Sequence, residues 1–240
     1  MPPAIVIRSV TGASLAVAPA ASSLRQAVEW AVANGRSLEG ADLRGADLRR
    51  ARLDRARLAR ADLTGARLQS AELPRADLRG AALDDALFTN ANLTGANLAG
   101  ASARRAVFVV ATLDAACLSS ADLASAELQK ASMRGTDLAC ARLGLARLDH
   151  ANLDGADLLL ADLGEASLVG ASLVGCRLSG ARCGSARFGR AELTGALLDG
   201  VELGGSDISG VRWGTRAREL RGNLARFGFP GFGRSRFAVA

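Results

Sequence analysis

The sequence lacks tyrosine and is poor in aromatic residues of every kind. Phenylalanine and tryptophan together make up 4% of its 240 residues, so a conventional globular core built around large rings is not expected. Histidine occurs once, and the four cysteines form no CxxC pair and have no metal-ligand spacing. We therefore expect no metal and no other cofactor. We interpret the cysteines as structural or surface thiols. They are Cys117, Cys140, Cys176 and Cys183.

Long apolar runs are also missing. No stretch of about 18 apolar residues exists that would span a membrane. The N-terminal residues lack a charged start, and polar residues such as Arg8 and Thr11 interrupt their apolar stretches, which fits a secretion signal poorly. We expect a cytoplasmic protein.

The net charge of +6 is concentrated near the C-terminus. Residues 36–215 carry 22 basic and 22 acidic side chains, whereas residues 216–240 carry six arginines against one glutamate. Interleaved arginine and phenylalanine can pair with phosphate and stack on bases, so nucleic acid or an anionic membrane surface is one hypothesis for this tail. The alternative is a soluble flank, or charge partners of a terminal cap. The basic tail residues are Arg216, Arg218, Arg221, Arg226, Arg234 and Arg236.

The dominant pattern is an unbroken five-residue repeat from Arg36 to Thr215, which makes 36 pentapeptides. Alanine occupies 30 of the 36 first positions and leucine 28 of the 36 third positions. A step of five on an α-helix advances by about 500°, so these leucines would spiral around all sides. On a flat strand an odd step would send alternate leucines to opposite faces. The remaining solution bends the chain at each repeat and points the first and third residues toward a common axis.

Strings such as ADLRG, ANLTG, ANLAG and ANLDG resemble the pentapeptide-repeat proteins, and the resemblance covers three quarters of the chain. It implies an all-β solenoid, a right-handed quadrilateral β-helix with four pentapeptides per coil, and therefore about nine coils. Glycine recurs at the fifth position, where a corner favours permissive dihedrals. A coil of 20 residues places Phe88, Phe108 and Phe188 on one side. We expect the rings of Phe108 and Phe188 to fill space left by the smaller residues Ala103 and Cys183; Phe88 has no such neighbour.

The two ends are expected to cover the solenoid or pair it with a second copy, because a solenoid exposes its apolar cross-section there. We divide the chain into residues 1–35, an N-terminal segment with a capping helix; residues 36–215, the β-helix; and residues 216–240, an Arg/Phe-rich cap or dimerisation module. Ser23 and Gly35 predict a helix from about 24 to 34, and the residues around Thr11-Gly12 predict a hairpin or an irregular strand pair. The residues expected to cap the last coil or to form a dimer contact are Trp213, Leu220, Leu224, Phe227, Phe229, Phe232 and Phe237.

No enzyme is indicated, because the carboxylates repeat on solvated positions without a distinguished neighbour and no phosphate-binding loop interrupts the register. Recognition is instead expected where apolar residues occupy outward positions. One cluster comprises Leu87, Val107, Val109 and Val110, and a smaller candidate comprises Leu159 and Leu160. Isolated exposed aliphatics are ordinary, and valine suits a strand, but the grouping favours an interface with another protein.

The family resemblance also bears on the partner. Members of similar length include the Qnr, mycobacterial quinolone-resistance and albicidin-resistance types, which bind DNA gyrase and protect it from antibiotic poisons and commonly dimerise through a C-terminal module. It thus implies a type II topoisomerase, DNA gyrase or topoisomerase IV, as partner. These members are thought to mimic DNA with an acidic face. Here the outward charges of the four sides sum to about −1, −3, +3 and 0, and no loop interrupts the repeat. A scaffold for another protein partner remains the competing hypothesis.

Overall fold

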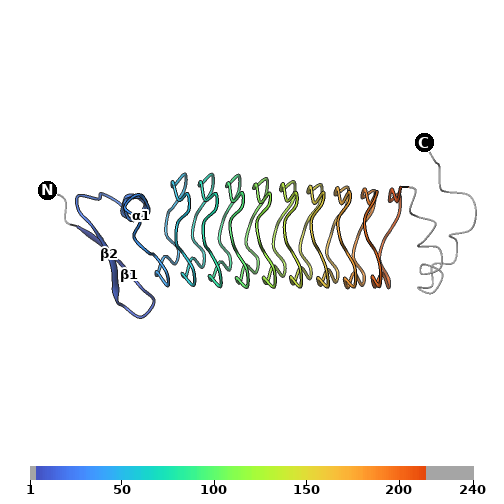
Figure 1. The fold of residues 1–240 in the computed structure, drawn as a ribbon, viewed down its shortest axis with the longest axis horizontal. Coiled ribbons are helices and arrows are strands. Elements are labelled where there is room, and N and C mark those ends of the chain that lie inside the picture. The colour runs from blue at the N-terminus through green and yellow to red at the C-terminus, as the bar shows by residue number, and fades with distance from the viewer. Residues whose placement is uncertain (1–3, 215–240) are drawn as a thin grey trace, which may run out of the picture.

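The computed structural model describes residues 4–214. Figure 1 shows an elongated molecule, in which a hairpin and a helix lie at the N-terminal end and a stack of coils extends away from them. No helix within the described residues is long and apolar enough to cross a membrane.

The N-terminal segment folds as a hairpin followed by a helix, as its sequence predicts. Strand β1 (Ile5–Arg8) pairs antiparallel with β2 (Ser14–Ala18), and Gly12 adopts a φ of 85° in the connecting turn. Helix α1 (Leu24–Ala33) begins after Ser23, whose side chain accepts a hydrogen bond from the backbone of Gln26. It ends one residue before the predicted boundary, because Asn34 leaves the helical conformation (φ −96°, ψ 16°) and Gly35 follows with a φ of 63°.

Both N-terminal elements contact the first coil. The backbone N–H of Val10 donates to the carbonyl of Gly40 at 2.9 Å, and that of Asp42 donates to the carbonyl of Arg8 at 2.8 Å. One face of α1 is buried in the apolar core that it shares with the coils, through Ala27, Val28 and Ala31. The N-terminal segment therefore shares one apolar core with the first coil.

Each coil is 20 residues long. Parallel bridges join residues twenty positions apart all along the repeat, from Asp42 with Asp62 to Glu192 with Arg212, and the bridged residue is the second of its pentapeptide. Hydrogen bonds of 2.8 Å run from the N–H of Leu43 to the carbonyl of Asp62 and from the N–H of Asp62 to the carbonyl of Ala41. Four pentapeptides thus complete one turn, and equivalent residues of successive coils lie one above the next.

The interior consists of columns of alanine and leucine. Leu43, Leu63 and Leu83 occupy one column and are at most 1% exposed. Two interior first positions are polar, but each hydroxyl is satisfied: Thr136 donates to the carbonyl of Leu113 at 2.9 Å, and Ser206 donates to the carbonyl of Cys183 at 2.6 Å. The inward direction of the first and third positions is confirmed.

Phe88, Phe108 and Phe188 lie on one side of the tube, as their spacing predicts. The rings of Phe88 and Phe108 stack with centroids 4.8 Å apart and planes within 5°, so Phe88 finds its partner in the next coil. Phe188 and Cys183 line a residual cavity of about 10 Å³ near Trp213. The ring of Phe188 therefore does not fill all of the space that the smaller Cys183 leaves.

The corners of the tube require left-handed backbone. At one of them the N–H of Ala46 donates to the carbonyl of Leu43 at 3.1 Å, and Gly45 has a φ of 60°. Every fifth position from 40 to 210 has a positive φ, and 20 of these 35 residues are not glycine. Each such residue bears a cost of about 1–2 kcal/mol, so the packing and hydrogen bonding of the coils outweigh the local preference at more than half of the corners.

Candidate interaction surface

The outward side chains form four walls, which we number from the pentapeptide that contains Leu38. The third wall consists of the pentapeptides that begin at residues 46, 66, 86, 106, 126, 146, 166, 186 and 206. Along this wall, bridges connect Arg67 with Leu87, Leu87 with Val107, and Val107 with Glu127. Residues that are far apart in sequence are therefore direct neighbours on one surface.

The structure brings the four predicted residues of the third wall together. We call Leu87, Val107, Val109 and Val110 the apolar cluster. Val110 is 47% exposed and the other three are half-buried. Directly beneath, the stacked rings of Phe88 and Phe108 fill the interior. The apolar cluster is thus a patch with a rigid backing.

Val110 occupies a corner with a φ of 60°. A β-branched residue in the left-handed region is a conformational outlier. The equivalent corners of the two adjacent coils hold Asn90 and Lys130, and asparagine tolerates this conformation well. At Val110 the chain accepts both backbone strain and an exposed apolar side chain, a combination that is typical of functional positions.

Two buried acceptors flank the apolar cluster. Gln69 and Gln129 lie one coil before and one coil after it, at the same pentapeptide position as Val109. The Oε1 atom of each is buried and has no hydrogen-bond partner within residues 4–214. An unpaired buried carbonyl is costly.

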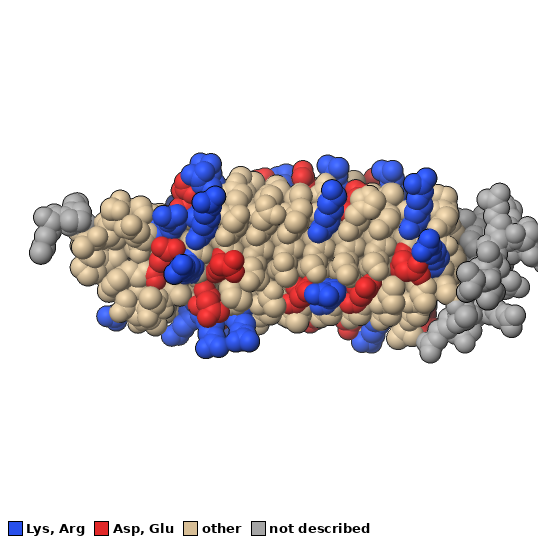
Figure 2. Space-filling model, turned by 90° about the horizontal axis from the view of Figure 1, so that it is seen from above, with Lys and Arg blue, Asp and Glu red and all other residues tan. Residues whose placement is uncertain are grey.

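The third wall is also the most positive of the four. Its outward positions carry seven basic and four acidic side chains, a net charge of +3. On the face in Figure 2, positive and negative side chains are intermingled, and much of the middle carries no charge. On the neighbouring walls acidic residues pair with arginine, as Asp85 does with Arg105 on the second wall and Asp114 with Arg134 on the fourth, each at 2.7 Å.

The second predicted candidate lies elsewhere. Leu159 and Leu160 belong to the first wall, on the other side of the tube from the apolar cluster. Leu160 is 58% exposed, and its side chain covers Gly180 so closely that a Cβ there would lie 2.7 Å from it. These two leucines form a separate, smaller surface.

Sequence reasoning missed three other exposed apolar residues of the repeat: Leu145, Val174 and Leu197. All three occupy outward positions of their pentapeptides, which was the signal available for them. They lie on different walls or corners and do not form one patch.

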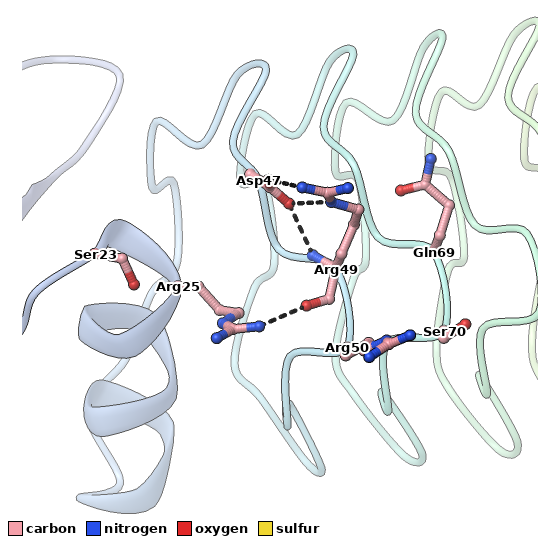
Figure 3. A pocket seen from close by; sticks show the side chains of 7 residues that line it. All are labelled: Ser23, Arg25, Asp47, Arg49, Arg50, Gln69 and Ser70. Carbon is pink, nitrogen blue, oxygen red and sulfur yellow. Dashed lines mark hydrogen bonds and ion pairs between the residues drawn. The ribbon is translucent and has the colours of Figure 1, made fainter.

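A groove at the N-terminal end of the third wall was also missed. It has a volume of about 600 Å³. Arg25 reaches it from α1, Arg49 and Arg50 lie in the first pentapeptide of the wall, and Gln69 and Ser70 lie in the next coil (Figure 3). No sequence motif marks it, because the helix and the two coils meet only in the folded chain.

Two carboxylates of the repeat illustrate how a neighbouring arginine favours the ionised form. The guanidinium of Arg49 donates hydrogen bonds of 2.8 and 2.5 Å to Asp47 and lowers the pKa of that carboxyl to about 2. Hydrogen bonds from Arg79 likewise lower the pKa of Asp77. Neither carboxyl has the raised pKa that would let it act as a general acid near neutral pH.

The interior thiols are shielded from chemistry. Burial raises the pKa of Cys176 and of Cys183 to about 12, so the reactive thiolate is scarce at neutral pH. Cys140 is exposed, and all four cysteines are free. Within residues 4–214, no three His, Cys, Asp or Glu side chains gather as a metal site would require.

The C-terminal predictions divide at the end of the described residues. Trp213 is 8% exposed and packs with the apolar core of the last coil. The other predicted cap or dimer residues and the arginines of the basic tail lie outside the described residues, so those assignments stay predictions of the sequence.

The sequence profile of pentapeptide repeats matches eight copies, over residues 37–69, 71–108, 116–155, 141–180 and 176–212. These segments cover most of the chain, and the protein therefore belongs to the pentapeptide-repeat family. Members of this family form right-handed quadrilateral β-helices, in agreement with the 20-residue coils. They are generally non-enzymatic structural or interaction proteins.

Several proteins of known structure are similar to this chain. HetL, a pentapeptide-repeat protein involved in regulating heterocyst differentiation in Nostoc sp. strain PCC 7120, is 35% identical over 70% of this chain and 82% of its own, with a TM-score of 0.37. Rfr23 from Cyanothece 51142 is 35% identical over 38% of this chain and 63% of its own, with a TM-score of 0.38. A trypsin-treated variant of QnrB1, a plasmid-mediated fluoroquinolone resistance protein, is 21% identical over 72% of this chain and 93% of its own, with a TM-score of 0.35. The comparison with curated proteins gives no match.

Proposed function

We propose that the protein is a non-enzymatic interaction protein that binds a partner protein through the apolar cluster of the third wall. The observation that carries the proposal is Val110, an exposed valine held in a left-handed conformation that glycine or asparagine would adopt at lower cost. Backbone outliers cluster at functional sites, and at Val110 the outlier coincides with an exposed apolar side chain.

The surroundings of the apolar cluster describe the partner. In the two adjacent coils of this wall the charged side chains are Arg67, Glu127 and Lys130, a net charge of +1 that adds a weak preference for an acidic rim on the partner. The partner therefore presents an apolar centre with a mildly acidic border.

The proposal includes the architecture of the ends. The hydrogen bonds of the hairpin to the first coil and the buried face of α1 support a capping role for the N-terminal segment. Residues 36–215 would then complete nine coils. Dimerisation through residues 216–240 and a cytoplasmic location remain predictions of the sequence.

The specific candidate partner is a type II topoisomerase, DNA gyrase or topoisomerase IV, which the protein would protect from antibiotic poisons. The resemblance of the repeat to topoisomerase-protecting proteins supports this candidate. The charge pattern does not support a DNA mimic, because acidic residues such as Asp157 and Asp162 are paired with arginines of the next coil at 3.2 and 2.9 Å. A contact through the apolar cluster would have to replace mimicry.

The test uses Val110→Asp with Ala115→Asp as its matched control. Both residues are exposed corners with positive φ, which aspartate tolerates, so both variants gain the same charge at equivalent backbone positions. Binding of each protein to purified gyrase is measured, together with supercoiling in the presence of a fluoroquinolone.

Loss of binding and protection in Val110→Asp, with both retained in Ala115→Asp, supports the topoisomerase candidate. If the wild-type protein neither binds gyrase nor changes supercoiling at micromolar concentration, that candidate is wrong. The scaffold proposal is then tested by affinity capture with the same three proteins. A partner captured by the wild type and Ala115→Asp but not by Val110→Asp supports it, and equal capture by all three contradicts it.

A further inference from the structure

The groove at the N-terminal end of the third wall concentrates positive charge. Three guanidinium groups, those of Arg25, Arg49 and Arg50, share it with the single carboxylate of Asp47 (Figure 3). That carboxylate is engaged by Arg49 at 2.5 Å. The side chains of the groove thus carry an excess of two positive charges, and helix α1, which contributes its first turn, has no acidic residue there.

Donors in the groove outnumber acceptors. Arg25 donates one hydrogen bond, from Nη1 to the carbonyl of Arg49 at 3.2 Å, and keeps further donors. Arg50 makes no side-chain hydrogen bond or ion pair with the described residues, and the hydroxyl of Ser70 lies beside it in the next coil. A planar guanidinium with unused donors matches the paired oxygens of a carboxylate or a phosphate.

Gln69 adds a requirement of the opposite kind. Its Oε1 atom is buried and has no partner within residues 4–214, and Figure 3 shows this amide oxygen directed toward the Arg49 side of the groove. Because the atom is buried, a ligand in the groove would satisfy it only if the Gln69 side chain turns outward and the ligand carries a hydrogen-bond donor. Phosphate with one protonated oxygen offers both, whereas a carboxylate at neutral pH offers acceptors alone.

We propose that this groove is a binding site for an oxyanion, held mainly by Arg25 and Arg50, and that phosphate is the form that also satisfies Gln69. The site is distinct from the apolar cluster, because it is built from α1 and the first two pentapeptides of the third wall. The proposal of this oxyanion site does not depend on whether the apolar cluster binds a protein.

The first measurement is calorimetric titration of the full chain with inorganic phosphate and, separately, with succinate, at low ionic strength. The variants are Arg50→Gln and Arg25→Gln. The matched control is Arg75→Gln, an exposed arginine at another corner with the same φ of 57° as Arg50. Because each arginine contributes charged hydrogen bonds, we expect Arg50→Gln and Arg25→Gln each to lower phosphate affinity about tenfold. We expect Arg75→Gln to leave it unchanged.

Gln69→Leu separates the two ligand chemistries. It is expected to weaken phosphate and to leave succinate unaffected, because only phosphate donates to the amide oxygen. Succinate binding without phosphate binding would overturn the assignment of phosphate and keep an oxyanion site.

Absence of saturable binding of either anion at millimolar concentration would overturn the site. So would an equal loss of affinity in Arg75→Gln and Arg50→Gln, since that result indicates diffuse attraction to a basic surface. Circular dichroism and the thermal midpoint of each variant, recorded without phosphate, establish that a loss of binding is not a loss of fold.

Discussion

The corners of the coil permit a stability test in which one chemical change has opposite effects at two sites. Ala115 occupies a corner with a φ of 55°, is exposed and belongs to neither proposed binding surface. Ala99 is the residue immediately before another corner and has a negative φ. Ala115→Gly and Ala99→Gly therefore remove the same methyl group from two residues of opposite backbone conformation.

The magnitudes come from two opposing contributions. Glycine costs roughly 0.5–1 kcal/mol relative to alanine, because it has more freedom to lose on folding. At Ala115 the substitution also relieves a left-handed conformation that costs about 1–2 kcal/mol. We expect Ala115→Gly to raise the free energy of unfolding by about 0.5–1 kcal/mol. Ala99→Gly should lower it by a similar amount, because no strain is relieved there. The Ala99→Gly variant retains the hydrogen bond that the backbone N–H of residue 99 donates to Oδ1 of Asn97.

The assay is urea unfolding followed by circular dichroism, with the transition midpoint and the slope fitted for each variant. A third variant, Gly100→Ala, reverses the change at a corner with a φ of 65° where an added Cβ meets no atom within 4 Å. It is expected to destabilise through strain alone. If Ala115→Gly and Ala99→Gly shift the midpoint in the same direction, the assignment of left-handed strain to the corners is wrong.

Three further predictions concern the interior, the ion pairs and the thiols. Leu63→Ala is expected to lower the free energy of unfolding by about 2–5 kcal/mol, because the buried column cannot collapse around the cavity; urea unfolding measures it, and a loss below about 1 kcal/mol would contradict the column. Arg49→Gln should raise the pKa of Asp47 from about 2 toward its usual value of 3.8, which NMR titration of the carboxyl detects. The stabilisation from this pair is present above the usual carboxyl pKa and is lost as the pH falls through about 2. In a thiol-reagent assay at neutral pH, Cys140 should react in the native protein and Cys176 only after unfolding; rapid native labelling of Cys176 would refute its burial.

Strain at the corners gives Val110 its significance. Most non-glycine corners carry polar, charged or small side chains, and Leu145, Leu160 and Val110 are the large apolar exceptions among the described residues. Of these, only Val110 is β-branched and adjoins a patch of other apolar residues. Val110 is therefore the corner at which this backbone cost coincides with an apolar patch.

The repeat was predictable because its chemistry is local and periodic. Alanine at the first and leucine at the third position of each pentapeptide exclude a helix and a flat strand. The same two positions are thereby identified as the inward ones, without reference to any distant contact. The stacking of Leu43, Leu63 and Leu83 and the hairpin and helix at the N-terminal end follow from such local signals. The apolar cluster was predictable for the same reason, since Leu87 lies one coil before Val107, Val109 and Val110 in a known register.

The groove shows where this reasoning stops. Outward side chains are constrained only by solvent, so the sequence does not say which of its many arginines share a space. Arg25 meets Arg49 and Arg50 because α1 packs against the first coil, and that packing is set by the buried face of the helix and not by the arginines themselves. The sequence by itself therefore determined the tube, its corners and its interior. Only the tertiary structure decided which charges lie together, because the juxtaposition of a helix and two coils depends on contacts between residues far apart in the chain.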